Sequence, residues 1–241
     1  ANGHVTAALE DFFPQSSYAQ RNNLFRNDGV TSPNGNFRFV DVSAQAGPGL
    51  QLVKSSRGTA IGDYDNDGDL DLALMGEVFE GGQAQRVVRL FDNEEALLFE
   101  DLAVSQQIVG VYHGALAWGD YDGDGDLDLA VAGWDVSDSE SLSLYKNDFV
   151  SRTLQQDRLQ IDASGESSLH GVRYAALAWG DADNDGDIDV AVSNSGQRLE
   201  LLRNETSANW IRIKTIGTVS NRDGIGCRVS LQAGKEITVQ E

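Results

Sequence analysis

Apolar residues alternate with polar or small residues in three short stretches of the chain. Leu70, Leu72 and Leu74 form the first stretch, and the same alternation occupies 127–131 and 188–192. A period of two is typical of a β-strand with one apolar face. Helical periodicity is weak, and only the segment TAALEDFF near the start predicts a short helix. The pattern therefore predicts an all-β protein.

Each of these stretches follows an aspartate-rich loop, and the three loops are closely similar. They read GDYDNDGDLDLAL from Gly62, GDYDGDGDLDLAV from Gly119 and GDADNDGDIDVAV from Gly180. The first aspartates stand at 63, 120 and 181, so that the spacings are 57 and 61 residues. Recurrence at this distance indicates a repeated structural unit.

Two weaker marks recur between the loops. The sequences LFRN, LFDN, LYKN and LLRN begin at residues 24, 90, 144 and 201, and the short segments FVD, FED and QID follow the first three of them. Each unit then holds about four short strands, which fits a blade of a β-propeller better than a helical solenoid. Four LxxN marks against three loops also lead us to expect a further loop before Ala1, so that the chain begins within a unit.

The aspartates of each loop have the spacing of a calcium-binding loop. Counted from the first aspartate, carboxylates stand at positions 1, 3, 5 and 9, position 7 offers a backbone carbonyl, and glycine at position 6 allows a sharp turn. Ca²⁺ takes six to eight oxygens at about 2.3–2.6 Å, so we expect about three ions per chain. The predicted metal residues are Asp63, Asp65, Asp67, Asp69 and Asp71 in the first loop, Asp120, Asp122, Asp124, Asp126 and Asp128 in the second, and Asp181, Asp183, Asp185, Asp187 and Asp189 in the third.

The first six positions resemble an EF-hand, but two features exclude that motif. Position 12 is Leu74, Val131 or Val192 instead of a bidentate glutamate, and a predicted strand follows the loop where an EF-hand has a helix. Mg²⁺ fits less well than Ca²⁺ because it requires a tight octahedron and retains its water. Solvated acidic turns without a bound metal are the remaining alternative.

The composition restricts the classes of partner. The chain of 241 residues has 38 acidic and 18 basic residues, which gives a formal net charge of -20. Such a charge argues against nucleic acids and anionic membrane surfaces as partners. The single cysteine, Cys227, excludes an internal disulfide and a multi-cysteine zinc site. No apolar run approaches the roughly 18 residues of a membrane span.

The loop pattern GDxDxDGDxDLA resembles the FG-GAP or VCBS repeat, which occurs in integrin alpha subunits and in many secreted bacterial proteins. The resemblance covers residues 1–205, and residues 206–241, with SNRDGIG, look like the truncated start of an ASPIC/UnbV domain, as in relatives of the cartilage acidic proteins. The resemblance implies blades of a β-propeller, commonly seven-bladed, with calcium in a loop of each blade. About three and a half units would form an incomplete part of such a propeller, followed by a short C-terminal β segment.

Residues outside the loops carry weaker signals. Trp118 and Trp179 each stand two residues before a loop, which favours packing between units over a sugar-binding role, and Trp134 is less constrained and is a candidate for an exposed position. The sequence NET makes Asn204 an acceptor for N-glycosylation in a host that has the machinery.

The sequence predicts a non-catalytic, calcium-binding scaffold for adhesion that presents its loops to a protein or polysaccharide partner. Open loops of this type suit millimolar calcium, so we expect a secreted, periplasmic or cell-surface location. The alternative is part of a secreted carbohydrate-active or phosphodiesterase-type enzyme on the same propeller. A cleft with a perturbed base near His113, His170 or Arg173 would favour the enzyme, although no nucleophile motif or phosphate loop appears in the sequence.

Overall fold

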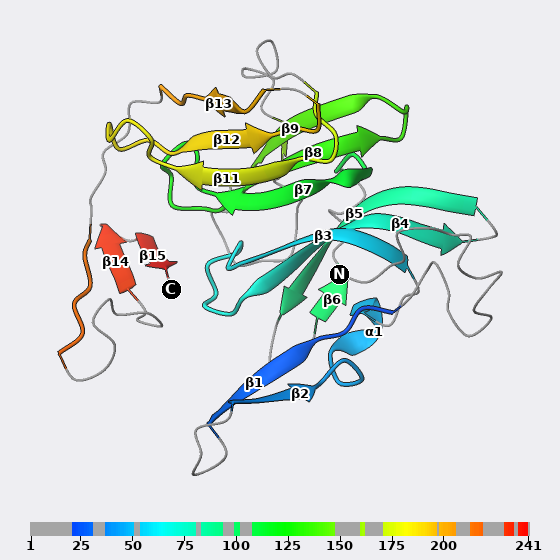
Figure 1. Cartoon of the computed structure of the whole chain (residues 1–241). Helices are drawn as coiled ribbons and strands as arrows, with labels where there is room; N and C mark the ends of the chain where they lie inside the picture. The colour runs from blue at the N-terminus through cyan, green and yellow to red at the C-terminus, as the bar shows by residue number, and fades with distance from the viewer. Residues whose placement is uncertain are drawn as a thin grey trace.

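The protein is all-β over the residues that its computed structural model describes, with one helical turn, α1 (Gly47–Leu50) (Figure 1). The described residues are 21–30, 37–50, 54–80, 83–93, 99–101, 108–147, 160–161, 171–196, 198–205, 213–218, 229–233 and 236–240. The helix predicted near the start lies outside them. In this part of the chain, no helix has the length and apolar character needed to cross a membrane.

Three antiparallel sheets follow one another along the chain, and each has an aspartate loop between its first two strands. The strands of each sheet are hydrogen-bonded in chain order. The first unit is β3 (Lys54–Gly62), β4 (Asp71–Glu80), β5 (Gln83–Asn93) and β6 (Phe99–Asp101); the second is β7 (Val111–Gly119), β8 (Asp128–Asp135), β9 (Glu140–Lys146) and β10 (Gln160–Ile161); the third is β11 (Ala176–Gly180), β12 (Asp189–Ser193) and β13 (Glu200–Leu202). The expected four strands are present in the first two units, and three are described in the third.

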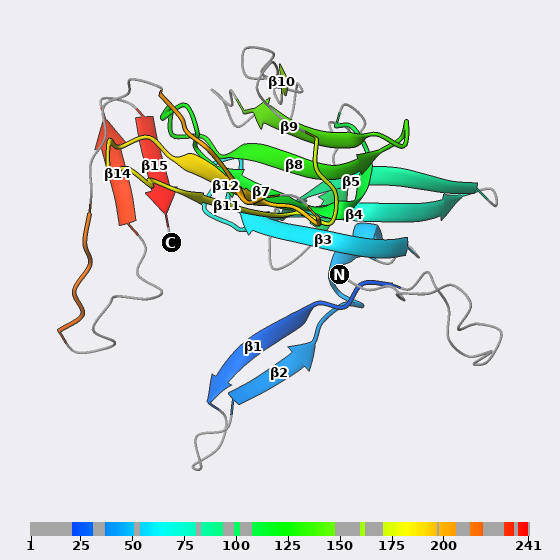
Figure 2. The ribbon, with the colours of Figure 1, turned by 45° about the horizontal axis from the view of Figure 1, so that its top comes forward.

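Two hairpins flank these sheets. β1 (Phe25–Val30) and β2 (Phe37–Asp41) carry the first LxxN mark and the FVD segment, and they pair antiparallel. β14 (Val229–Ala233) and β15 (Glu236–Gln240) form a second antiparallel pair, which stands beside the sheets in Figures 1 and 2. None of the described sheets closes into a ring.

The second unit packs between the first and the third. Ala73 of β4 shares one buried cluster with Leu129 and Val131 of β8, and Ala132 of β8 shares another with Val190 of β12. Burial of these side chains removes apolar surface from water and stabilises the stack of sheets (Figure 2).

The strand after the first loop is buried on both faces, which corrects the prediction of a single apolar face. Asp71 and Ala73 belong to the predicted polar face, yet they are only 2% and 0% exposed, and Ala73 packs in a cluster with side chains of the second unit. Leu72 and Leu74 on the other face share a cluster with Leu50 of α1.

Aromatic rings join neighbouring units beside the loops. Tyr64 stacks on Trp118 with ring centroids 6.0 Å apart, and Tyr121 stacks on Trp179 at 6.5 Å. The glycine before each of these loops permits the approach, since a Cβ atom on Gly119 would lie 2.7 Å from the Trp179 ring. The predicted packing of both tryptophans between units is therefore confirmed.

Candidate metal centres

Each aspartate loop gathers three carboxylates at the same end of the stacked sheets. In every group, one oxygen from each carboxylate lies within 4.8 Å of the others. Each of the three acidic groups could hold a metal ion. The groups are Asp63, Asp65 and Asp71; Asp120, Asp122 and Asp128; and Asp181, Asp183 and Asp185.

Two left-handed residues bend each loop around its carboxylates. The φ angle at position 4 is 58°, 73° and 65° in the three loops, and at the position-6 glycine it is 98°, 96° and 104°. Glycine and asparagine, which occupy these positions, adopt this conformation most readily. The bend directs the amide of Gly68 to the Asp63 carboxylate at 3.0 Å and that of Gly125 to Asp120 at 3.1 Å. The sharp turn predicted at position 6 is confirmed.

The aspartate at position 9 holds the two ends of its loop together. One oxygen of Asp71 accepts the N–H of Tyr64 at 3.0 Å, and the other accepts the N–H of Asn93 at 2.9 Å. Asp128 and Asp189 accept the equivalent amide pairs at 2.8 to 2.9 Å. The aspartate at position 9, which the sequence predicted only as a metal ligand, therefore fixes the backbone of the loop.

Burial of these carboxylates disfavours their charged form. It raises the pKa of Asp71 to about 8 and that of Asp128 to about 8. Burial, with Asp67 and Asp92 close by, raises the pKa of Asp65 to about 7. Folding therefore concentrates negative charge at an energetic cost, and a bound cation would relieve it.

The asparagine that ends the LxxN mark of the second and third units links its own loop to the loop of the preceding unit. Asn147 donates from Nδ2 to the carbonyl of Leu127 at 3.2 Å and to the carbonyl of Tyr64 in the first loop at 2.6 Å. Asn204 makes the equivalent bonds to its own loop and to the second loop. Because both amide hydrogens of Asn204 are engaged, the structure argues against its predicted glycosylation.

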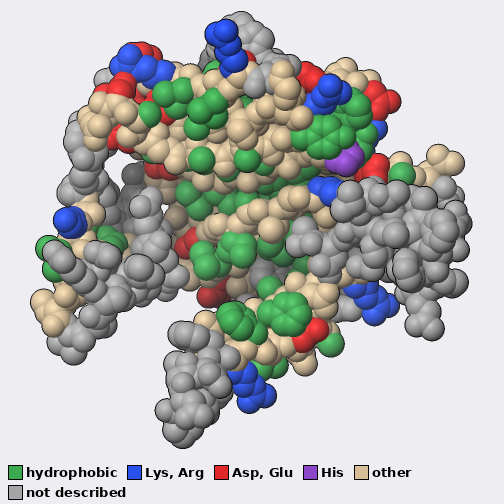
Figure 3. Space-filling model, in the orientation of Figure 1, with side chains coloured by type: hydrophobic (Ala, Val, Ile, Leu, Met, Phe, Trp, Pro, Cys, Tyr) green, Lys and Arg blue, Asp and Glu red, His purple; other side chains and the backbone are tan. Residues whose placement is uncertain are grey.

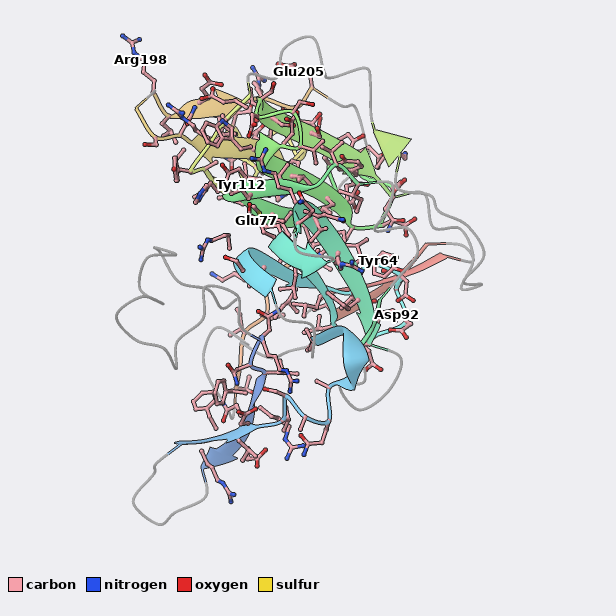
Figure 4. All side chains as sticks on the ribbon, turned by 90° about the vertical axis from the view of Figure 1, so that its right-hand side faces the viewer. Tyr64, Glu77, Asp92, Tyr112, Arg198 and Glu205 are labelled. Carbon is pink, nitrogen blue, oxygen red and sulfur yellow. The ribbon has the colours of Figure 1, made fainter. Side chains whose placement is uncertain are left out.

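A charged residue directly before that asparagine differs between the units. Lys146 pairs with the aspartates at positions 3 and 5 of the second loop, and Arg203 pairs with those of the third. In the first unit this place belongs to Asp92, which is only 3% exposed and lies at the same end of the unit as Tyr64 (Figure 4). Two loops thus face a basic side chain, and the first faces another carboxylate.

The predicted ligand set is brought together only in part. Positions 1 and 3 join every group, whereas position 9 joins the first two groups and position 5 joins only the third. The position-7 carboxylate of Asp126 accepts the side-chain amide of Asn66 at 2.7 Å, so it links two loops. Sequence reasoning missed Asp92, Lys146 and Arg203, although their fixed place before the LxxN asparagine was a usable signal.

No family model, no curated protein and no solved structure matches the chain. Function is therefore inferred below from the loops and from the surface of the described residues.

Proposed function

We propose that each aspartate loop binds one Ca²⁺ and that the protein is a non-catalytic, extracellular scaffold built from propeller-type blades. The observation that carries this proposal is the convergence of three carboxylates within 4.8 Å in each of three loops. Calcium is favoured over magnesium because the oxygens belong to bent, irregular loops, which suit its flexible coordination.

Calcium would stabilise the contacts between units as well as each loop. The loops are bonded to one another through Asn147 and Asn204, so an ion that orders one loop also supports its neighbour. A ligand that binds only the folded chain adds about 2.7 kcal/mol per site at a hundredfold excess over its Kd. A stack with three such sites would then present its surface to a protein or polysaccharide partner.

The proposal is tested by counting calcium on the purified chain after dialysis into millimolar calcium. We expect about three ions per chain, and Asp122→Ala should remove one because this carboxylate belongs to the second group. Asp28→Ala, on the β1 hairpin away from the loops, should leave the count unchanged. A chelator should lower the melting temperature, and added calcium should restore it.

A count near zero, or a melting temperature that a chelator leaves unchanged, would contradict the proposal. Equal binding of magnesium at the same free concentration would contradict the choice of ion.

A further inference from the structure

Four aromatic rings and two arginines gather at the end of the sheets opposite the aspartate loops. We call them the aromatic patch: Tyr112, His113, Trp134 and Tyr174, with Arg86 and Arg173. The ring centroids of Tyr112 and His113 are 4.2 Å apart, those of Tyr112 and Trp134 are 5.7 Å apart, and those of His113 and Tyr174 are 4.7 Å apart. Figure 4 shows Tyr112 beside Glu77 and away from Tyr64, which marks the loop end.

The first unit shows that the fold does not require these rings. In the second unit Tyr112 pairs across the strands with Trp134, and Trp134 directly follows a glycine with φ of 150°. At the same place in the first unit Ser55 pairs with Glu77, and Glu77 directly follows a glycine with φ of 153°. The same cross-strand pairing therefore forms with a small and an acidic residue, so it does not depend on the aromatic pair.

The backbone beneath the patch adopts conformations that residues other than glycine rarely occupy. His113 has φ of 52°, Tyr174 has φ of 50° and Asp138 has φ of 58°. The N–H of Tyr174 donates to the carbonyl of His113 at 2.5 Å, which ties the two strained residues together. A β-bulge between Tyr112 and Ala115 lies at the same point, and the first unit has the equivalent bulge between Ser56 and Gly58. The positive φ of His113, in contrast, has no counterpart at Ser56. Backbone strain of this kind concentrates where side chains are aimed for function.

The patch is accessible and its charges are balanced. Tyr174 is 55% exposed, and in Figure 3 the histidine, in purple, borders hydrophobic side chains in green and a basic side chain in blue. The Arg86 guanidinium lies 4.2 Å from the Tyr112 ring centroid and pairs with Asp138. Arg173 lies 5.3 Å from the Trp134 centroid and pairs with the nearby Glu140 at 3.2 Å.

The histidine adds no net charge to this surface at neutral pH. Burial and the neighbouring Arg57 lower the pKa of His113. The patch thus offers ring faces, paired guanidinium donors and paired carboxylate acceptors, with little charge left over. An anionic ligand would also be repelled by a chain with a formal charge of -20.

We propose that the aromatic patch binds a neutral polysaccharide. A sugar ring has an apolar C–H face, which stacks on an aromatic ring, and a rim of hydroxyls, which both donate to carboxylates and accept from guanidinium groups. An exposed platform also suits a long chain, which extends beyond the site on both sides. This inference rests on the scaffold function proposed above and names the class of its partner.

Isothermal titration with four neutral hexasaccharides tests the assignment: cellohexaose, xylohexaose, mannohexaose and maltohexaose, in saturating calcium. At least one should bind with Kd of about 0.01–1 mM. Tyr174→Ala should weaken that binding at least about tenfold, and Trp134→Ala should do the same. Tyr174→Phe should bind like the parent, because it keeps the ring.

The controls separate this proposal from the calcium proposal. Phe25→Ala removes an exposed ring of β1, 57% exposed and outside the patch, and should not change sugar binding. The calcium count of Tyr174→Ala should equal that of the parent protein, which shows that its weaker sugar binding does not come from lost calcium. If the parent protein binds its calcium but none of the four sugars, the aromatic patch proposal alone is overturned. Binding unaffected by Tyr174→Ala, no binding of any of the four sugars, or tighter binding of hexagalacturonate would each overturn the proposal.

Discussion

The first and second aspartate loops share one backbone but differ in the charge placed against it. In both, a buried aspartate at position 9 accepts two backbone amides, and an asparagine from the third strand closes the loop. The residue before that asparagine is Asp92 in the first unit and Lys146 in the second. We call this hydrogen-bonded loop backbone the frame. The frame is the same in both units, whereas the charge beside it depends on the single residue before the asparagine.

Because the two loops have the same backbone, the difference between Asp92 and Lys146 should change the affinity for a cation without changing the shape of the loop. Lys146 already supplies a positive charge to the second loop, at 3.1 Å from Asp124, and its own pKa is raised by the hydrogen bond to Asp122. Asp92 instead adds to the charge that raises the pKa of Asp65. We therefore expect the first loop to bind calcium more tightly than the second, with the third resembling the second because of Arg203.

The largest expected effect tests the shared frame. Asp71→Ala and Asp128→Ala each remove the acceptor of two buried amides, which should lower the free energy of unfolding by about 2–5 kcal/mol even in a chelator. The two losses should agree closely, because the two loops have the same bonds. Urea denaturation measures both.

The matched controls for the frame are Asp67→Ala and Asp124→Ala, which alter exposed position-5 carboxylates. In a chelator these should cost less than about 1 kcal/mol. A similarly small loss for Asp128→Ala would show that position 9 does not hold the loop together.

The second effect is a dependence on pH in the absence of metal. The folded pKa values of Asp71 and Asp128 are about 8 and that of Asp65 is about 7, all above the ordinary value of 3.8. Between pH 4 and these values the three folded carboxyls bind more protons than they do in the unfolded chain, so the stability that they contribute is highest at low pH and falls as pH rises. The fall is up to about 1.4 kcal/mol per pH unit for each carboxyl.

Melting curves in a chelator should therefore show a lower melting temperature at pH 7.5 than at pH 5.5. Asp65→Asn should reduce this slope, because it removes one of the titrating groups of the first loop. Saturating calcium should flatten or reverse the slope, since metal ligands must be deprotonated. A melting temperature that rises over this range in the chelator would contradict the raised pKa values.

The sequence predicted the β class and the central part of each loop. Alternation after Leu70 was enough to place a strand, and the spacing of positions 1 and 3 was enough to predict two carboxylates that converge in every loop, because both depend on neighbours within a few residues. The packing of Trp118 between units was also predicted correctly, since its fixed distance from the loop repeats at Trp179 in the third unit.

Features that depend on contacts between distant residues could not be predicted in this way. One of the two backbone hydrogen bonds that each position-9 aspartate accepts joins residues 15 to 22 positions apart, and the hydrogen bond from Asn66 to Asp126 spans 60 positions. The burial of Ala73 likewise depends on the second unit packing against it. The propeller arrangement and the ASPIC/UnbV-like tail remain predictions.

The third effect tests the difference between the loops directly. Lys146→Met removes the tethered charge from the second loop and should tighten its calcium binding about tenfold, or about 1.4 kcal/mol. Asp92→Asn should weaken calcium binding by the first loop, because it replaces a nearby carboxylate with an uncharged amide of similar size. Titrations in a background of Asp65→Ala with Asp183→Ala isolate the second loop, and Asp122→Ala with Asp183→Ala isolates the first.

Arg26→Met is the control for this charge test, since it removes an exposed ion pair with Asp28 on the β1 hairpin. It should change neither affinity. If the first loop binds calcium no more tightly than the second, or if Lys146→Met leaves the second loop unchanged, the neighbouring charge does not set the affinity.

The smallest effect concerns position 4, where the first loop has Asn66 and the second has Gly123. The Asn66 amide donates to Asp126 at 2.7 Å, so Asn66→Gly should cost about 0.5–1.5 kcal/mol, reduced by the ease with which glycine adopts φ of 58°. Gly123→Asn offers the reverse test, because φ of 73° is accessible to asparagine and the third loop carries Asp187 at the matching position. It should add a link between the second and third loops and raise stability by up to about 1 kcal/mol in urea denaturation with calcium. If Asn66→Gly is neutral and Gly123→Asn destabilises, the loops are coupled through the LxxN asparagines alone.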